Sequence, residues 1–93
     1  MSGSNGGAPA TARTYEIHIE AIAATGLLER IAGVLRRRGC AISRVEFDQD
    51  ADAGTARLTA AVQARDGALL AAQLRRLEDV RAVTFFEFTT ENT

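Results

Sequence analysis

The chain has 93 residues, enough for one small domain with a single hydrophobic core. Its 11 basic and 12 acidic residues give a net charge of −1, which excludes the basic excess typical of nucleic-acid-binding proteins. The single cysteine excludes an intramolecular disulfide and a multi-cysteine metal site. No apolar run is long enough to span a bilayer and the N-terminus lacks a signal-peptide pattern. We therefore expect a cytoplasmic protein with no membrane or nucleic-acid partner.

The first element expected along the chain is a half-buried strand at residues 15–21. Residues 1–13 precede it and are mostly small, polar and glycine-rich, so we expect a disordered tail followed by one domain over residues 14–90. In the strand, apolar and polar residues alternate with period two, which predicts one buried face. The residues predicted to face inward are Tyr15, Ile17, Ile19 and Ala21.

An amphipathic helix over residues 26–38 is predicted next. Thr25 is its expected N-cap, because the hydroxyl can accept a hydrogen bond from a first-turn N–H. Gly39 is expected to end the helix in the left-handed conformation. The residues of the predicted apolar face recur at spacings of three and four and are Leu27, Leu28, Ile31, Val34 and Leu35.

A β-hairpin is predicted to follow. Its parts are a strand at residues 40–48, a connection at 48–54 and a strand at 55–64. In the first strand, Ile42, Val45 and Phe47 are spaced by three and then by two residues, so strict alternation fails once. A β-bulge near Ser43 and Arg44 would place all three side chains on one face.

The pattern of strand, helix and strand then repeats. Asp66 is the predicted N-cap of a second helix, whose inward stripe is Leu70, Leu74 and Leu77. A last strand is expected at residues 81–89. The order βαββαβ with right-handed crossovers predicts an α+β fold, the ferredoxin-like sandwich, in which two helices cover one face of an antiparallel sheet.

Several kinds of chemistry found on this fold are disfavoured by the residues. The run of Asp48, Asp50 and Asp52 lacks the central glycine and closing glutamate of a calcium loop, so we interpret it as a solvated hairpin tip. The phenylalanines of the last strand are interpreted as core residues, which leaves no aromatic platform for RNA. The lone His18 has no nucleophile readable beside it and is interpreted as a solvent-facing or interface residue. Cys40 is interpreted as structural.

Two longer segments resemble the ACT-domain regulatory proteins, and most closely the small regulatory subunit of acetolactate synthase (acetohydroxyacid synthase). The first runs from Gly26 to Ile42 and reads GLLERIAGVLRRRGCAI. The second runs from Gln73 to Val83, reads QLRRLEDVRAV, and is similar to that family's exit from its second helix. Both occur in the expected order, and the resemblance extends over about residues 15–88.

The resemblance implies an ACT domain with no catalytic activity and no cofactor of its own, present as a homodimer. Such subunits bind the large thiamine-diphosphate-dependent catalytic subunit of acetolactate synthase, which acts in branched-chain amino-acid biosynthesis, and raise its activity. In many members they also confer inhibition by valine. The effector then lies between two ACT domains, near the loop after the first strand and the start of the second strand. The corresponding residues here are Ala23, Thr25, Gly26, Leu27, Ala41 and Ile42.

The chain departs from the family pattern in this expected effector site. Asparagines that commonly contact the effector are replaced by Ala23 and Ala41, and a proline that often precedes the loop glycine is replaced by Thr25. Alanine offers no side-chain hydrogen bond, and each polar group of a buried amino acid left unpaired costs on the order of 1–3 kcal/mol. We therefore expect the short type of small subunit, with weak or absent valine response.

Contact with the large subunit is expected at three residues, Gly33, Glu78 and Asp79. Gly33 lies on the predicted polar face of the first helix, where alanine would be favoured by up to about 1 kcal/mol. The two acids lie at the predicted end of the second helix, where they oppose its dipole. Loop capping by Asp79 and simple tolerance of Gly33 stay open as alternatives.

Two other functions are known to fit this topology. A stand-alone ACT dimer would sense another small ligand and regulate a different enzyme. An acylphosphatase-like enzyme is disfavoured, because the loop at residues 23–26 contains no arginine to hold a phosphate.

Overall fold

The computed structural model describes residues 13–88, which form four strands and two helices. In chain order the elements are β1 (Arg13–Ile22), α1 (Leu27–Arg37), β2 (Ala41–Asp50), β3 (Thr55–Ala64), α2 (Gly67–Arg75) and β4 (Val80–Phe88). The predicted order βαββαβ is confirmed. The tail expected at residues 1–13 lies outside the described residues except for Arg13, which begins β1, and so does the expected domain end at residue 90. Within the described range, no helix is long and apolar enough to cross a membrane.

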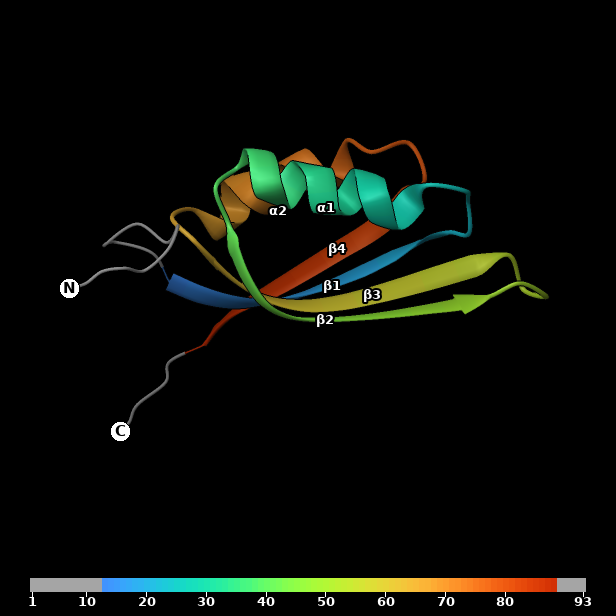
Figure 1. The fold of residues 1–93 in the computed structure, drawn as a ribbon, viewed down its shortest axis with the longest axis horizontal. Helices are drawn as coiled ribbons and strands as arrows, with labels where there is room; N and C mark the ends of the chain where they lie inside the picture. Colours follow the sequence, from blue (N-terminus) through green and yellow to red (C-terminus); the bar gives the residue numbers. More distant parts are fainter. Residues whose placement is uncertain (1–12, 89–93) are drawn as a thin grey trace.

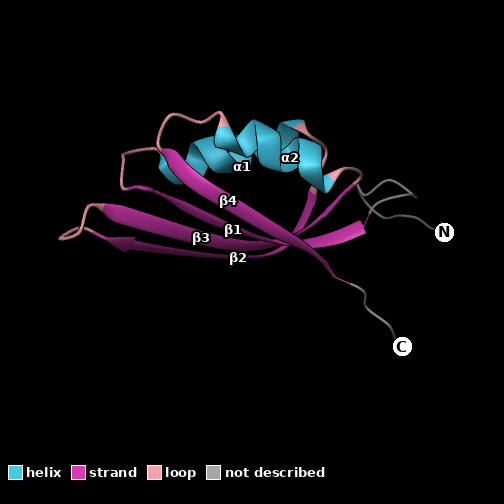
Figure 2. Cartoon of the chain, turned by 180° about the vertical axis from the view of Figure 1, so that it is seen from behind, coloured by secondary structure: helices cyan, strands magenta, loops and turns pink. Residues whose placement is uncertain are grey.

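The four strands form one antiparallel sheet in the order β2-β3-β1-β4. β1 is central and pairs with β3 along its whole length, from Arg13 opposite Ala64 to Ile22 opposite Thr55. Both helices lie over the same face of the sheet (Figures 1 and 2). The other face, called the open face below, has no described helix or strand packed on it. This is the ferredoxin-like sandwich that the sequence predicted.

The hydrophobic core lies between the helices and the inner face of the two central strands. All four inward residues predicted for β1 are buried, each at most 7% exposed. The largest fully buried side chains are Ile17, Ile19, Leu27, Ile31, Val62, Leu70 and Leu74. Burying one such side chain contributes about 1.5–3 kcal/mol, so these residues hold both helices on the sheet.

The C-terminus of α1 is closed as predicted. Gly39 has a φ of 72° and donates its N–H to the Arg36 carbonyl oxygen at 3.0 Å. The Cys40 N–H donates to the Leu35 carbonyl oxygen, also at 3.0 Å. These two hydrogen bonds form a Schellman motif, which needs a left-handed residue and therefore favours glycine.

The N-terminus of α1 differs from the prediction. The N-cap is Gly26, with φ 79°, and no described side chain accepts a hydrogen bond from the first turn. Thr25 is therefore not the cap, because the left-handed turn at Gly26 delays the helix by one residue. Leu28, predicted on the buried face, is 38% exposed. Gly33, expected on the polar face, is buried.

The edge strand β2 confirms the predicted bulge, since its register with β3 shifts between Ile42 and Arg44. Ile42 pairs with Val62 and Val45 pairs with Ala60, so these side chains share the helix-covered face. Ile42 and Val45 are nevertheless each 42% exposed, while their β3 partners are at most 1% exposed. The helix layer therefore covers β3 much more completely than the edge strand beside it.

In α2 and β4, two predictions are confirmed and one is wrong. The Asp66 carboxylate caps α2 by accepting the Leu69 N–H at 3.0 Å, and Leu70 and Leu74 are buried as predicted. The phenylalanines of β4 are not all core residues. Phe86 and Phe88 are 51% and 45% exposed on the open face, because they occupy the strand positions that alternate with buried Val83.

Candidate effector and partner sites

The loop between β1 and α1 is tied to two other loops through backbone hydrogen bonds. The Ile22 N–H donates to the Asp79 carbonyl oxygen at 2.9 Å, in the turn between α2 and β4. The Ala23 N–H donates to the Gly54 carbonyl oxygen at 3.0 Å, in the hairpin between β2 and β3. The loop is therefore held in place by both neighbouring turns.

The first turn of α1 keeps free donors beside this loop. Among the described residues, the N–H groups of Leu28 and Glu29 have no acceptor, whereas the Leu27 N–H donates to the Ala24 carbonyl oxygen at 3.2 Å. The Leu27 N–H is therefore already engaged within the loop, and the N–H groups of Leu28 and Glu29 are the free donors of the first helical turn. An open helix N-terminus favours an anion such as a carboxylate.

Arg30 covers the same loop from α1. Its guanidinium donates to the Thr25 carbonyl oxygen at 3.2 Å and pairs with the Asp79 carboxylate. A Cβ at Gly26 would lie 3.3 Å from Arg30 Nη1, and its φ of 79° strains any other residue. Gly26 thus serves both the left-handed turn and the close approach of the guanidinium.

One chain does not bring the two halves of the expected effector site together. Ala23 precedes α1, whereas Ala41 and Ile42 begin β2 after α1 has ended. The 11 residues of α1 span about 16 Å, so the two alanines lie at opposite ends of the helix. A single ligand can touch both sets only if a second chain supplies one of them.

The residues expected at a partner contact lie in different environments. A Cβ at buried Gly33 would lie 3.3 Å from Arg37 Nη1 on the same helix. Because α2 ends at Arg75, Glu78 and Asp79 lie in the following turn and not on the helix. Glu78 is exposed, and the Asp79 carboxylate is engaged by Arg30.

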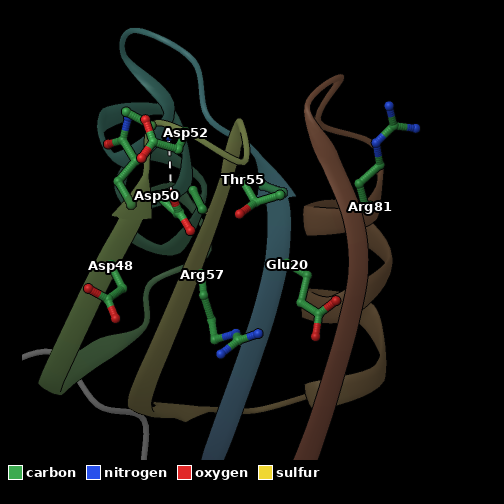
Figure 3. Close-up of a pocket in the computed structure, with 11 residues that line it drawn as sticks. Glu20, Asp48, Asp50, Asp52, Thr55, Arg57 and Arg81 are labelled. Carbon is green, nitrogen blue, oxygen red and sulfur yellow. Dashed lines mark hydrogen bonds between the residues drawn. The ribbon is translucent and has the colours of Figure 1, made fainter.

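A groove that the sequence did not indicate lies at the hairpin end of the sheet and has a volume of about 630 Å³. We call it the acidic groove. The charged residues that line it are Glu20, Asp48, Asp50, Asp52, Arg57 and Arg81. Figure 3 shows Asp48, Arg57 and Glu20 on three neighbouring strands, with Arg81 directed away from the other labelled side chains. The only sequence signal for this groove is the charge on the polar positions of three separate strands, whose pairing one sequence does not reveal.

The described residues form no arrangement suited to nucleophilic catalysis. His18 lies on the open face, 3.3 Å from a Glu16 carboxylate oxygen and edge-to-face with Phe86. Cys40 is packed against the core on the other face. Burial raises the pKa of the Cys40 thiol, although the nearby Arg38 charge partly lowers it. His18, the possible base, and Cys40, the possible nucleophile, thus lie on opposite faces of the sheet.

Known structures show the same fold. The ACT domain of a GTP pyrophosphokinase from Chlorobium tepidum has 18% identity and a TM-score of 0.70, over 82% of this chain and 100% of that one. A formyltetrahydrofolate deformylase from Pseudomonas putida has 14% identity and a TM-score of 0.70, over 78% of this chain and 28% of that one. The acetolactate synthase small subunit of Thermotoga maritima has 24% identity and a TM-score of 0.66.

The chain spans only part of some of these proteins. The alignment with the Thermotoga small subunit covers 77% of this chain and 46% of that one. No curated protein sequence matches the chain. Residues 23–83, more than half of the chain, match the ACT domain family. The chain therefore belongs to the ACT domain family, whose domains are regulatory and not catalytic.

Proposed function

We propose that the chain is the non-catalytic small subunit of acetolactate synthase, located in the cytoplasm and acting as a homodimer with weak or absent valine response. The motif from Gly26 to Ile42 supports this function, as does the likeness to the Thermotoga small subunit. The observation that carries it is the start of α1 with the loop before it, where the Leu28 and Glu29 N–H groups are free to hold an anion but residue 23 has no polar side chain.

The homodimer is supported by the outer edge of β2. In the described chain this edge has no partner strand, and exposed Ile42 and Val45 lie along it. Antiparallel pairing of two β2 strands would bring Ala41 of one copy toward the effector loop of the other.

The weak valine response follows from the chemistry at Ala23 and Ala41. The free Leu28 and Glu29 N–H groups can hold a carboxylate. Neither alanine can hydrogen-bond the amino group of a ligand. Losing two such contacts weakens binding by about a hundredfold or more.

The function is tested by mixing the protein with the large acetolactate synthase subunit of the same organism. We expect association and a rise in synthase activity, with little inhibition by millimolar valine. Sedimentation should show at least a dimer. A protein that remains monomeric at tens of micromolar and leaves the activity of the large subunit unchanged would refute the proposal.

Calorimetry separates the valine claim from the subunit claim. Valine should bind weakly to the unmodified protein, and the double change Ala23→Asn with Ala41→Asn should recover part of the binding. Ala53→Asn, in the exposed hairpin turn, is the matched control and should have no effect. Tight, saturable valine binding by the unmodified protein would return the chain to the feedback-inhibited class.

The alternative is a stand-alone ACT dimer that senses another ligand. The observation that favours it is the spread of similar structures, which include a GTP pyrophosphokinase and a deformylase besides the small subunit. Gene neighbourhood distinguishes the two proposals, because a small subunit is expected beside a large acetolactate synthase gene.

A further inference from the structure

Two rows of charged residues cross the open face, and only one of them is paired internally. In the first row, Arg44 reaches across Ala61 and donates to both Glu16 carboxylate oxygens at 2.9 Å. In the second row, Arg57 lies between Asp48 on β2 and Glu20 on β1. No ion pair within 4.0 Å joins the charges of this second row in the described chain. Its charges therefore stay available to an external group.

The second row forms the floor of the acidic groove, where negative charge is in excess. Four carboxylates and two guanidiniums line the groove. Figure 1 shows that the hairpin of β2 and β3 extends beyond the helix layer, so the groove lies on a projecting part of the molecule. A basic segment of another protein would fit such a surface by charge, whereas an acidic segment or a nucleic acid would be repelled.

The hairpin that walls the groove is held in one conformation by its own hydrogen bonds. The Asp50 carboxylate accepts the Asp52 and Ala53 N–H groups at 3.1 and 3.2 Å. The Gly54 N–H donates to the Asp50 carbonyl oxygen at 2.9 Å. A partner would therefore meet a preorganised surface and lose little affinity to loop ordering.

The groove is also connected to the effector loop. Thr55 lines the groove and pairs with Ile22 at the end of β1. The preceding Gly54 accepts the Ala23 N–H at 3.0 Å. A partner that grips the hairpin thus holds the residues that position the loop, which is the connection a regulatory subunit needs between its effector and its catalytic partner.

We propose that the acidic groove is the docking site for a lysine- or arginine-bearing segment of the large catalytic subunit. The inference rests on the proposed function. Asp48, Asp52 and Glu20 attract the basic side chains, and Arg57 keeps the groove selective by pairing with an acidic group of the same segment. The groove lies on the open face, whereas Ile42 and Val45, which support the contact between copies, lie on the helix-covered face, so docking and dimer formation use different faces of the sheet.

The test compares charge reversals on β2 and in the following turn by their effect on association with the large subunit. Asp48→Arg should weaken association about tenfold or more, because it replaces an attraction with a repulsion. Asp52→Arg, in the exposed turn, should also weaken association and provides a second test if Asp48→Arg folds poorly. Glu46→Arg is the matched control. It lies on the same strand and the same face and makes the same change in charge, but Glu46 does not line the groove.

The readouts are surface binding kinetics, sedimentation and circular dichroism. We expect all three variants to keep the spectrum and dimer of the unmodified protein, and added salt to weaken binding of the unmodified protein more than that of Asp48→Arg. Unaltered association of the folded Asp48→Arg and Asp52→Arg variants would overturn the docking site while leaving the proposed function intact. An equal loss of association in Glu46→Arg would also overturn the docking site. Failure of the unmodified protein to bind the large subunit would overturn both proposals.

Discussion

β1 and β2 are strands of equal length with apolar side chains on the same face of the sheet, yet their burial differs sharply. The inward residues of β1 are at most 7% exposed, whereas Ile42 and Val45 on β2 are 42% exposed. The difference comes from position in the sheet. β1 is central, with a strand on each side and helices above it, while β2 forms an edge.

This comparison shows that the alternating pattern predicts which face a side chain occupies, but not whether anything covers it. On β1 the apolar side chains stabilise the chain itself. On β2 they remain partly in water and favour contact with a second surface. If the homodimer forms through β2 as proposed, stability and association depend on different strands, and substitutions can separate the two roles.

The largest difference in the free energy of unfolding is expected between a substitution in the core and a substitution on the edge strand. Leu74→Ala, at a side chain that is fully buried, should lower the free energy of unfolding by about 2–5 kcal/mol. Val45→Ala should lower it by less than about 1 kcal/mol, since much of that side chain is already exposed. Urea unfolding at low protein concentration measures both. Equal losses in the two variants would mean that β2 is as well covered as the centre.

A smaller loss of stability is expected from substitution of Gly67, a glycine of α2 that packs against Tyr15 on the covered face of the sheet. A Cβ at Gly67 would lie 2.5 Å from Tyr15 Cε1 and 2.7 Å from its Cζ, so Gly67→Ala forces the ring or α2 to move. We expect a loss of about 1–3 kcal/mol despite the better helix propensity of alanine.

Gly33→Ala is the matched control for this clash, because its Cβ would meet only the end of the flexible Arg37 side chain. It should leave the free energy of unfolding unchanged or raise it. Destabilisation by Gly33→Ala as large as that by Gly67→Ala would contradict the close packing of α2 on Tyr15. Thermal unfolding followed by circular dichroism is sufficient for both variants.

The features that the sequence predicted correctly are those governed by neighbours along the chain. Asp66 caps the helix that begins at the next residue, and Gly39 takes the left-handed conformation just after the C-cap residue of α1. The spacing of Ile42 and Val45 required a bulge, which the pairing of β2 shows. Each of these depends on chemistry within a few residues, so one sequence contains it.

The features that the sequence did not predict depend on distant parts of the fold. Phe85 and Phe86 are adjacent in the chain, but one packs against Tyr15 and the other lies on the open face. Their apolar character alone could not show that no helix covers that face. The acidic groove was missed for the same reason, since Asp48, Arg57 and Glu20 become neighbours only after three strands pair.

The exposed side chains of β2 are expected to affect association more than folding. Ile42→Ser with Val45→Ser should weaken the homodimer about tenfold or more, because apolar area buried between copies is lost. The monomer should keep its circular dichroism spectrum. Phe88→Ser on β4 is the control, because its side chain is similarly exposed and β4 is the opposite edge of the sheet from β2. Sedimentation equilibrium compares the unmodified protein with the two variants, and an equally weakened dimer in the Phe88 variant would place the contact elsewhere.

The smallest expected effect is at Cys40, which lies between the covered and uncovered regions, where α1 passes into β2. Burial raises the pKa of its thiol above the ordinary value of 9.0, and the Arg38 charge partly opposes this rise. The folded protein therefore binds the thiol proton more tightly than the unfolded chain. The free energy of unfolding is unaffected below the thiol pKa of the unfolded chain and falls as the pH rises from there through the thiol pKa of the folded protein.

Alkylation of Cys40 by iodoacetamide in mildly alkaline buffer should be slower in the folded protein than in urea, because less thiolate is present. Arg38→Gln should slow it further by removing the charge that stabilises the thiolate, whereas Arg36→Gln should not. Faster alkylation in the Arg38 variant would show that this arginine shields Cys40 sterically and that its charge is not the controlling influence.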